Sequence, residues 1–369
     1  MNKTTNRSNF VIQEKTVVAW SGDALDARVP YGVTHVGPNA FKNCKKLARV
    51  RLPSTVVSVD SGAFYGCDSL EKINFPNGLE TIGAYAFYNC GSLARIKFPR
   101  SIRVVENHAF YGCRSLKAIV LPNGVQSVGV NAFSNCISAR RVALPGSLRY
   151  LGDFVFSKCA ALVSLKIRYG IEYLPNSAFY KCAALTFVAL PNSITILEKS
   201  CFCDAESLRE IRFSKKLRSI GTGCFVNAGL EKVIVPESVA EIGEGAFGRC
   251  VKLRYVSLPD GLIAIRANTF VYCENLAYFR CPSSLRSIGR GAFLNCRKMR
   301  RVVLNDGLLR IEKGAFWDSG LETLEIPSTV VAIGDCAFVG IGAKTVRLPK
   351  NLKECGKGVF DRTDAKIVC

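Results

Sequence analysis

Histidine is almost absent from this sequence, which limits the chemistry that the chain can perform. Only His35 and His108 occur among 369 residues, and they fall at different phases of the repeat described below. Neither has a Ser or Cys nucleophile suggested by the local sequence, and a catalytic triad needs all of its members to converge. The chain also lacks a G-x-x-x-x-G-K-[ST] phosphate loop, and no pair of carboxylates can be singled out. We therefore expect no enzyme and no cofactor.

Long apolar runs are missing as well. No stretch approaches the ~18 apolar residues of a membrane-spanning helix. The polar residues 1–9 are not followed by the apolar core of a secretory signal peptide. From these absences alone we expect a cytoplasmic protein without a transmembrane segment.

Acidic residues are few relative to basic ones. The chain has 50 Lys and Arg against 29 Asp and Glu, which gives a net charge of +21. This excess favours an acidic partner, such as nucleic acid, an anionic glycan, an anionic lipid or an acidic protein. Net charge, however, concerns association and solubility rather than one activity. The hydrophobic fraction of 49% is ample for a continuous core, so the chain is not expected to be disordered.

What the sequence has in abundance is one repeat of 23 residues. It is clear in residues 52–73, and the next copy begins at residue 75. Fifteen repeats begin at residues 30, 53, 76, 99, 122, 145, 168, 191, 214, 236, 259, 282, 305, 327 and 349. Most steps are 23 residues long, and three are 22. A short internal period makes such an array one continuous structure rather than a series of globular domains.

Each repeat carries the pattern of one turn of a solenoid. Val50 and Leu52 alternate with polar residues, as in a strand with one buried face. Pro53 has no N–H to donate, so it ends that strand. A glycine follows in most repeats, as at Gly83, and we expect it to allow a turn that other residues resist. The Ala-Phe pair comes next, and its Phe recurs in all fifteen repeats.

The segment from the Ala-Phe pair to the next Cys is long enough for one helical turn only. The predicted fold is therefore an α/β repeat solenoid, with mostly short strands in a parallel sheet and one-turn helices. No single repeat can bury its apolar face alone, whereas stacked neighbours can.

Ten of the 17 cysteines share one phase of the repeat, namely Cys44, Cys67, Cys90, Cys113, Cys136, Cys159, Cys182, Cys250, Cys273 and Cys296. Like side chains on successive turns point in parallel, about 5 Å apart, whereas a disulfide needs Cβ atoms near ~3.8 Å that face each other. We interpret the column as buried thiols that pack as small hydrophobes, with disulfides or a metal as the alternative. Cys201, Cys203 and Cys224 supply no fourth ligand for a structural zinc site, so no metal is predicted.

The chain is predicted to have three parts. Residues 1–9 form a polar leader, and residues 10–23 form an N-terminal β-hairpin that caps the first turn. Residues 24–369 form the solenoid of about fifteen 22–23-residue repeats. Residues 364–369 are expected to form a last strand with nothing after it. An uncovered strand edge favours self-association, so we expect a monomer or a weak dimer through this C-terminal edge.

The repeat L-P-x-x-L-x-x-I-G-x-x-A-F-x-x-C-x-x-L-x-x-I resembles the BspA-like class of leucine-rich repeats. Leu258-Pro259-Asp260-Gly261-Leu262, Ile265, Thr269-Phe270, Cys273 and Leu276 carry the pattern, as do residues 282–299, and the likeness covers about residues 24–369. The chain lacks the Asn and the long helix of general leucine-rich repeats. The resemblance implies a curved right-handed solenoid with a parallel sheet on one side. It also implies a cell-surface or secreted binding protein engaged in adhesion, whereas the missing signal peptide predicts a cytoplasmic one.

The strand positions on either side of the central inward residue vary between repeats, so any function must lie there. Of these thirty positions, thirteen are basic and three are acidic, and Phe187, Tyr255 and Tyr278 share the same face. Rows of cations with a few aromatic rings can bind a polyanion through charge and stacking. The candidate ligand-binding residues are Arg28, Arg49, Arg51, Lys72, Arg95, Lys97, Arg141, Lys166, Phe187, Arg212, Lys232, Tyr255, Tyr278, Arg280, Arg301 and Arg347.

Three interpretations of this face stay open. The first is a non-enzymatic binding protein whose partner is a protein or an anionic glycan, with adhesion as the context that the family implies. The second is an intracellular scaffold or a nucleic-acid or polyanion binder, which the missing signal peptide and the thiol column support. The third is that the charges only keep a long sheet soluble, since 37 other Lys and Arg residues lie elsewhere.

Overall fold

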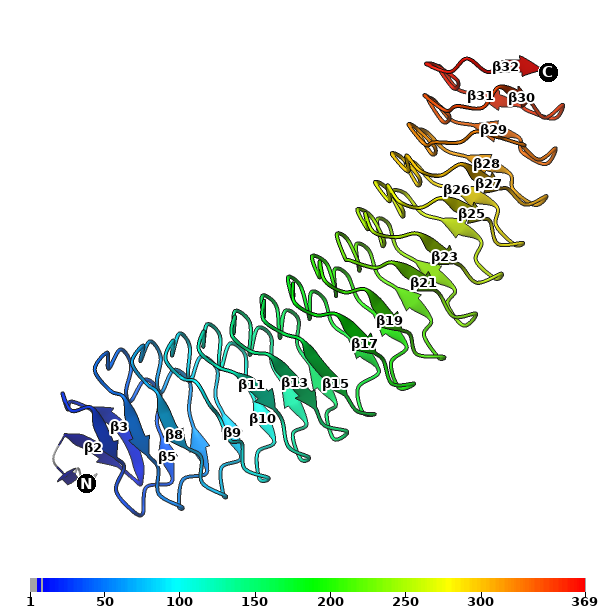
Figure 1. Ribbon diagram of the computed structural model, residues 1–369. Helices are drawn as coiled ribbons and strands as arrows, with labels where there is room; N and C mark the ends of the chain where they lie inside the picture. Colours follow the sequence, from blue (N-terminus) through cyan, green and yellow to red (C-terminus); the bar gives the residue numbers. More distant parts are fainter. Residues whose placement is uncertain (1–4, 8, 369) are drawn as a thin grey trace. The chain divides into compact units, whose positions relative to one another are not determined.

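The computed structural model of the protein describes residues 5–7 and 9–368 (Figure 1). The predicted leader of residues 1–9 therefore lies largely outside the described residues. The chain divides into two compact blocks. We call Met1–Ile171 with Pro175–Leu185 the N-terminal block, and Glu172–Leu174 with Thr186–Cys369 the C-terminal block.

The N-terminal block has two lines of strands. The first is one sheet in the order β1 (Thr5–Arg7), β2 (Phe10–Gln13), β3 (Thr16–Trp20), β5 (His35–Val36), β7 (Ser58–Val59), β9 (Thr81–Ile82), β10 (Val104–Val105), β12 (Ser127–Val128) and β14 (Tyr150–Leu151). The second line consists of β4 (Asp26–Arg28), β6 (Arg49–Arg51) and β8 (Lys72–Asn74), and then of β11 (Ala118–Val120), β13 (Arg141–Leu144) and β15 (Ser164–Ile167). Pairing is antiparallel within β1–β3 and parallel everywhere else in these sheets.

The C-terminal block repeats the same two lines with parallel pairing. One line consists of β16 (Tyr173–Leu174), β18 (Ile196–Leu197), β20 (Ser219–Ile220) and β22 (Glu241–Ile242), and then of β24 (Ala264–Ile265), β26 (Ser287–Ile288), β28 (Arg310–Ile311), β29 (Ala332–Ile333) and β31 (Glu354–Cys355). The other line consists of the pairs β17 (Phe187–Ala189) with β19 (Glu210–Arg212), β21 (Lys232–Ile234) with β23 (Tyr255–Ser257), β25 (Tyr278–Arg280) with β27 (Arg301–Val303), and β30 (Thr345–Arg347) with β32 (Lys366–Val368).

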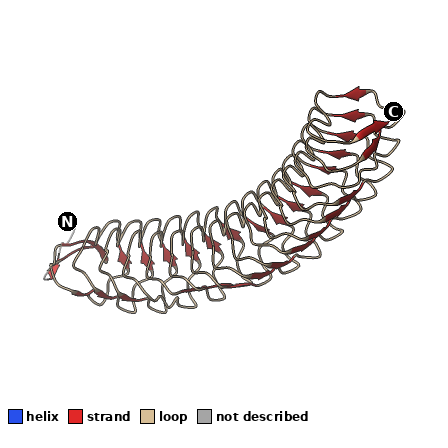
Figure 2. Cartoon of the chain, turned by 45° about the horizontal axis from the view of Figure 1, so that its top comes forward, coloured by secondary structure: helices blue, strands red, loops and turns tan. Residues whose placement is uncertain are grey.

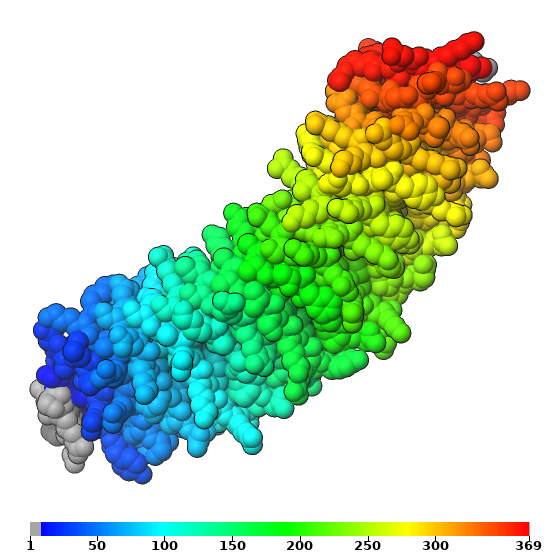
Figure 3. Space-filling model, in the orientation of Figure 1, coloured from blue at the N-terminus to red at the C-terminus, as the bar shows by residue number. Residues whose placement is uncertain are grey.

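Within each parallel sheet, neighbouring strands are the equivalents of successive repeats. Val50 on β6 faces Ala27 on β4 and Ile73 on β8, for example. The protein is therefore a parallel-strand solenoid of about fifteen turns, as the repeat predicts, and we call each turn a rung. Within each block, the space-filling view shows successive rungs as narrow bands across the surface (Figure 3).

The predicted one-turn helices are wrong, because the described residues contain strands and loops but no helix (Figure 2). Every rung has two residues in the left-handed region, one directly before the Ala-Phe pair and one four positions later, such as Asn39 (φ 57°) and Asn43 (φ 59°). The backbone N–H of Phe41 donates to the carbonyl of Ala63 on the next rung, at 2.7 Å. A helix needs continuous right-handed dihedrals and hydrogen bonds between residues four apart, whereas this segment has only single turns, such as Cys44 N–H to Phe41 O at 3.2 Å.

Stacked Phe rings form the centre of the core. Phe87, Phe110 and Phe133 are fully buried, and their ring centroids are 5.0 and 5.2 Å apart with almost parallel planes. At the N-terminal end, Trp20 and Phe10 of the β2–β3 hairpin contact Phe41, with centroids 5.5 and 6.1 Å away. The hairpin thereby covers the first ring of this column.

The cysteine column lies beside the Phe rings as free thiols. Cys44 is half-exposed, and the other nine thiols of the column are buried. Each of these nine donates to the carbonyl of the Phe on the preceding rung, as in Cys113 Sγ to Phe87 O at 3.3 Å and Cys136 Sγ to Phe110 O at 3.3 Å. Burial raises the pKa of Cys159 to about 12. Cys therefore fills a small apolar site and also provides a weak donor for a buried carbonyl.

The glycine column has a different cause from the one that the sequence suggests. Gly83 and Gly152 do not have a positive φ. A Cβ on Gly83 would instead meet the carbonyl carbon of Asp60 at 2.7 Å, and one on Gly152 would meet the nitrogen of Val130 at 2.3 Å. Glycine is required there because the backbones of adjacent rungs approach closely, not because of a special turn.

At the C-terminal end, β32 pairs with β30 in parallel, and Ile367 on β32 is 37% exposed. Dimerisation through this edge stays a prediction.

The stacked column makes a direct prediction about stability. Phe110→Ala should lower the free energy of unfolding by about 3–5 kcal/mol, because it removes a fully buried ring and leaves a cavity between Phe87 and Phe133. Urea unfolding followed by circular dichroism measures this change. Tyr150→Ala is the control, since that ring is 45% exposed, and its effect should stay within about 0.5 kcal/mol. Equal losses for the two variants would contradict the role of the column.

Candidate binding surface on the strand face

The strand face comprises the outward side chains of the line that runs from β4 to β15 in the N-terminal block and from β17 to β32 in the C-terminal block. In β6, Val50 is buried while Arg49 and Arg51 are exposed, and the same pattern occurs in β4, β8, β19, β21, β25 and β30. All sixteen candidate residues are exposed. Arg95 and Lys97 occupy equivalent positions on a rung where no strand forms.

The two blocks differ in the chemistry of this face. In the N-terminal block, eight of fourteen flanking positions are basic and one, Asp26, is acidic. In the C-terminal block, five of sixteen are basic and two are acidic. The aromatic candidates Phe187, Tyr255 and Tyr278 all belong to the C-terminal block, so charge and aromatic area are separated.

Few of the thirteen basic candidates have an acidic partner among the described residues. Arg49 pairs with Asp26 at 3.7 Å, and Arg212 pairs with Glu210 at 3.3 Å. Two of these candidate cations lie over aromatic rings, Arg212 over Phe187 at 5.2 Å and Lys232 over Tyr255 at 5.3 Å, both in the C-terminal block. The other cations of the strand face have no carboxylate within 4.0 Å in this part of the chain, and they are available to an external anion.

A hollow of about 710 Å³ opens in the N-terminal block where the strand line is interrupted between β8 and β11. Its floor includes Ile96, which is half-exposed, although the equivalent Val50, Ile73 and Ile119 are buried. Its charged lining consists of Arg49, Glu71, Lys72, Arg95, Lys97 and Lys117.

Two Phe residues stand beside this interruption. Phe75 and Phe98 occupy the position where most rungs have an aliphatic residue before the Pro, and their ring centroids are 6.0 Å apart. In the core of the same two rungs, the centroids of Phe87 and Phe110 are only 5.0 Å apart. We predict that the bulk of Phe75 and Phe98 acts locally and prevents the strand at 95–97 from pairing.

A second hollow, of about 550 Å³, lies on the other side of β11 in the same block. Four cations line it and no carboxylate does; they are Arg100, Arg141, Lys166 and Arg168. Leu144 and Pro145 contribute to its apolar walls. The two hollows are therefore adjacent along the solenoid.

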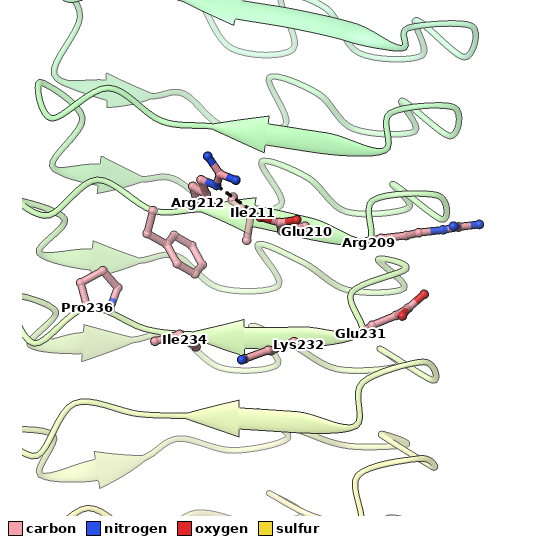
Figure 4. A pocket seen from close by; sticks show the side chains of 9 residues that line it. Arg209, Glu210, Ile211, Arg212, Glu231, Lys232, Ile234 and Pro236 are labelled. Atoms are coloured by element: carbon pink, nitrogen blue, oxygen red, sulfur yellow. Dashed lines mark hydrogen bonds and ion pairs between the residues drawn. The ribbon is translucent and has the colours of Figure 1, made fainter.

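The C-terminal block has a hollow of about 550 Å³ between β19 and β21, where charges of both signs meet. Figure 4 shows the Arg212–Glu210 ion pair along β19, while Arg209 and Glu231 extend from the starts of neighbouring strands. Because its cations are balanced by Glu210 and Glu231, this hollow is a weaker anion site than those of the N-terminal block.

The sequence pattern missed Lys117, Arg100 and Arg168, which lie outside the flanking positions but line the two hollows. The consecutive Phe-Pro pairs at 75–76 and 98–99 were a signal that could have located the first hollow.

No group of three or more His, Cys, Asp and Glu residues that could hold a metal is found in the described part of the chain. His35 lies on β5, and its ring nitrogen is 2.9 Å from the hydroxyl of Thr34. His108 stacks on Tyr85 at 4.7 Å, and burial lowers its pKa. Neither histidine lies on the strand face, and the two belong to different rungs.

Comparison with known proteins identifies the class. A model of the BspA type leucine rich repeat region matches residues 23–140, 129–254, 218–340 and 310–368, so the chain belongs to this family. This confirms the resemblance seen in the repeat. Solenoids of this family are typical interaction scaffolds and are generally non-enzymatic. No helix of the described residues has the length and apolarity to cross a membrane.

Solved structures support the fold. A leucine-rich repeat protein from Bacteroides ovatus is 24% identical with a TM-score of 0.76, covering 98% of this chain and 90% of that one. A leucine rich cell surface protein from Faecalibacterium prausnitzii is 22% identical with a TM-score of 0.54, over 86% and 93% of the two chains. A leucine-rich repeat protein from Eubacterium ventriosum is 17% identical with a TM-score of 0.53, over 96% and 90%. No curated protein matches the chain.

The origin of the first hollow can be tested by substitution. Phe98→Leu introduces the aliphatic side chain that most other rungs carry at this position, so we expect the strand at 95–97 to pair with its neighbours. Hydrogen exchange of the amides at 95–97 should then slow by at least about tenfold. Leu121→Met, a swap of similar volume in the next rung, is the control and should leave this exchange unchanged. Unaltered exchange in Phe98→Leu would show that the rings do not cause the interruption.

Proposed function

We propose that this chain is a non-enzymatic binding protein whose strand face engages a macromolecular partner, either a protein or an anionic glycan. The observation that supports it best is the set of exposed cations on this face that lack an acidic partner, such as Lys72, Lys97 and Arg141. The cations are also crowded on this face, since thirteen of the thirty flanking positions are basic and three are acidic.

The exposed aromatic residues of the C-terminal block fit the same proposal. Tyr255 is 46% exposed and Tyr278 is 43% exposed. Aromatic and Arg side chains contribute most of the binding energy in many protein interfaces. Adhesion to a surface or matrix molecule is the context that the family resemblance suggests for such binding.

A charge-reversal variant tests the proposal. Arrays of glycans and of proteins would be probed with the intact chain and with a variant that carries Arg49→Glu, Lys97→Glu, Lys232→Glu and Arg280→Glu. Partners bound by the intact chain should be lost, because four attractive charges on the strand face become repulsive.

The matched control carries four reversals away from the strand face, Arg149→Glu, Lys158→Glu, Arg218→Glu and Lys353→Glu, all at exposed positions. It has the same net charge and should keep the partners. If the control loses them as well, net charge explains the binding. If neither variant loses them, the strand face is not the binding surface.

A further inference from the structure

We infer that the two adjacent hollows of the N-terminal block form one binding track for a linear sulfated glycan. This inference rests on the proposed function and specifies its ligand and its place. The track runs over six rungs, from β6 to β15, and is about 24 Å long at the spacing of paired strands.

The charge of the track favours a densely charged ligand. Nine cations line the two hollows, and the only carboxylate is that of Glu71. Of the nine, only Arg49 has an acidic partner within 4.0 Å among the described residues. The net excess exceeds one positive charge per rung. A glycan that carries several sulfate esters per disaccharide matches this density, whereas one that carries only carboxylates is too sparsely charged.

The lining also distinguishes a glycan from other polyanions. No aromatic side chain lines either hollow. Single-stranded nucleic acids are held largely by stacking of their bases on aromatic rings, and protein interfaces are enriched in Tyr and Trp. The exposed aromatic residues of the strand face lie in the C-terminal block instead. A ligand that needs charge but no stacking fits the N-terminal block.

The hollows combine cations with apolar surface. Ile96 in the first hollow is half-exposed and Val120 in the second is 47% exposed, so both offer apolar surface to sugar rings. Arg95 and Lys97 flank Ile96 on the same rung, so their cationic groups stand on both sides of this residue. In the second hollow, Arg141 and Lys166 come from the neighbouring strands β13 and β15. Sulfate groups on both edges of an extended glycan can therefore contact these cations at the same time.

The test measures binding of a size-defined heparin oligosaccharide to the full chain by calorimetry. The track variant carries Arg95→Glu, Lys97→Glu and Arg141→Glu. The matched variant carries Arg218→Glu, Arg290→Glu and Lys353→Glu, at exposed positions of the C-terminal block outside the strand face, with the same change of net charge. We expect the track variant to bind on the order of 1000-fold more weakly, since each of the three lost charged contacts weakens binding roughly tenfold. The matched variant should lose less than about fivefold, as expected for screened charges beyond a Debye length.

Two further probes separate the ligand classes. Hyaluronan, which carries carboxylates and no sulfate, and a single-stranded DNA oligonucleotide should each bind the intact chain at least tenfold more weakly than the heparin oligosaccharide. Equal or tighter binding of either probe would overturn the sulfated glycan as the ligand. Equal losses in the two variants would overturn the location.

The outcomes also distinguish this inference from the proposed function. If the heparin oligosaccharide does not bind but an arrayed protein still needs the strand face, the inference fails and the proposed function stands. If no partner depends on the strand face, both fail. Circular dichroism of each variant excludes unfolding as the cause of a loss.

Discussion

Each rung depends on its neighbours to bury its apolar face, and this dependence constrains the whole structure. The Phe column shows it most clearly. Phe87, Phe110 and Phe133 stack at about the spacing of adjacent rungs, and hydrogen bonds such as Phe110 N–H to Ala132 O at 2.7 Å join the same rungs. Ring stacking and backbone pairing therefore favour the same spacing. A substitution at a position that faces this core therefore affects both the ring stacking and the backbone pairing.

The constraint explains how the sequence can be divided between packing and recognition. Phe, Cys and Leu recur because each of them contacts its equivalents on the rungs before and after. The flanking positions of the strands, such as those of Arg49 and Arg51, project away from the core and are free to vary. In the N-terminal block they are mainly basic, and in the C-terminal block they include Tyr255 and Tyr278. Phe75 and Phe98 are a local exception to the repeat, and they directly follow residues near the hollow that opens among the cations, such as Lys97.

Much of the fold could be predicted from the sequence, because the repeat fixes which residues lie side by side. The parallel pairing of Val50 with Ile73 and the exposure of Arg49 follow from the period and from strand alternation. The helical turns could not be excluded in this way, since the left-handed conformation of Asn39 and Asn43 depends on pairing with the next rung. Gly83 was assigned to a turn, but the close approach of the backbone at Asp60 becomes visible only in three dimensions.

The candidate site was predictable only in part, for a similar reason. Strand alternation identifies Lys97 and Arg141 as outward residues of the flanking positions. It does not identify Lys117, Arg100 and Arg168, because they reach the hollows from outside the strands. The sequence also does not show which of the flanking cations are paired with a carboxylate. Arg212 proves to be paired with Glu210, whereas Lys72 and Lys166 have no acidic neighbour among the described residues.

The most direct measurement is a crystal structure of the full chain with a size-defined heparin oligosaccharide. The account predicts that the glycan lies along the strand face of the N-terminal block, with sulfate oxygens within hydrogen-bond distance of Lys97 and Arg141. It also predicts that the Phe and Cys columns keep their positions, since packing and recognition use different residues. A glycan bound to the C-terminal block, or to a surface other than the strand face, would contradict it.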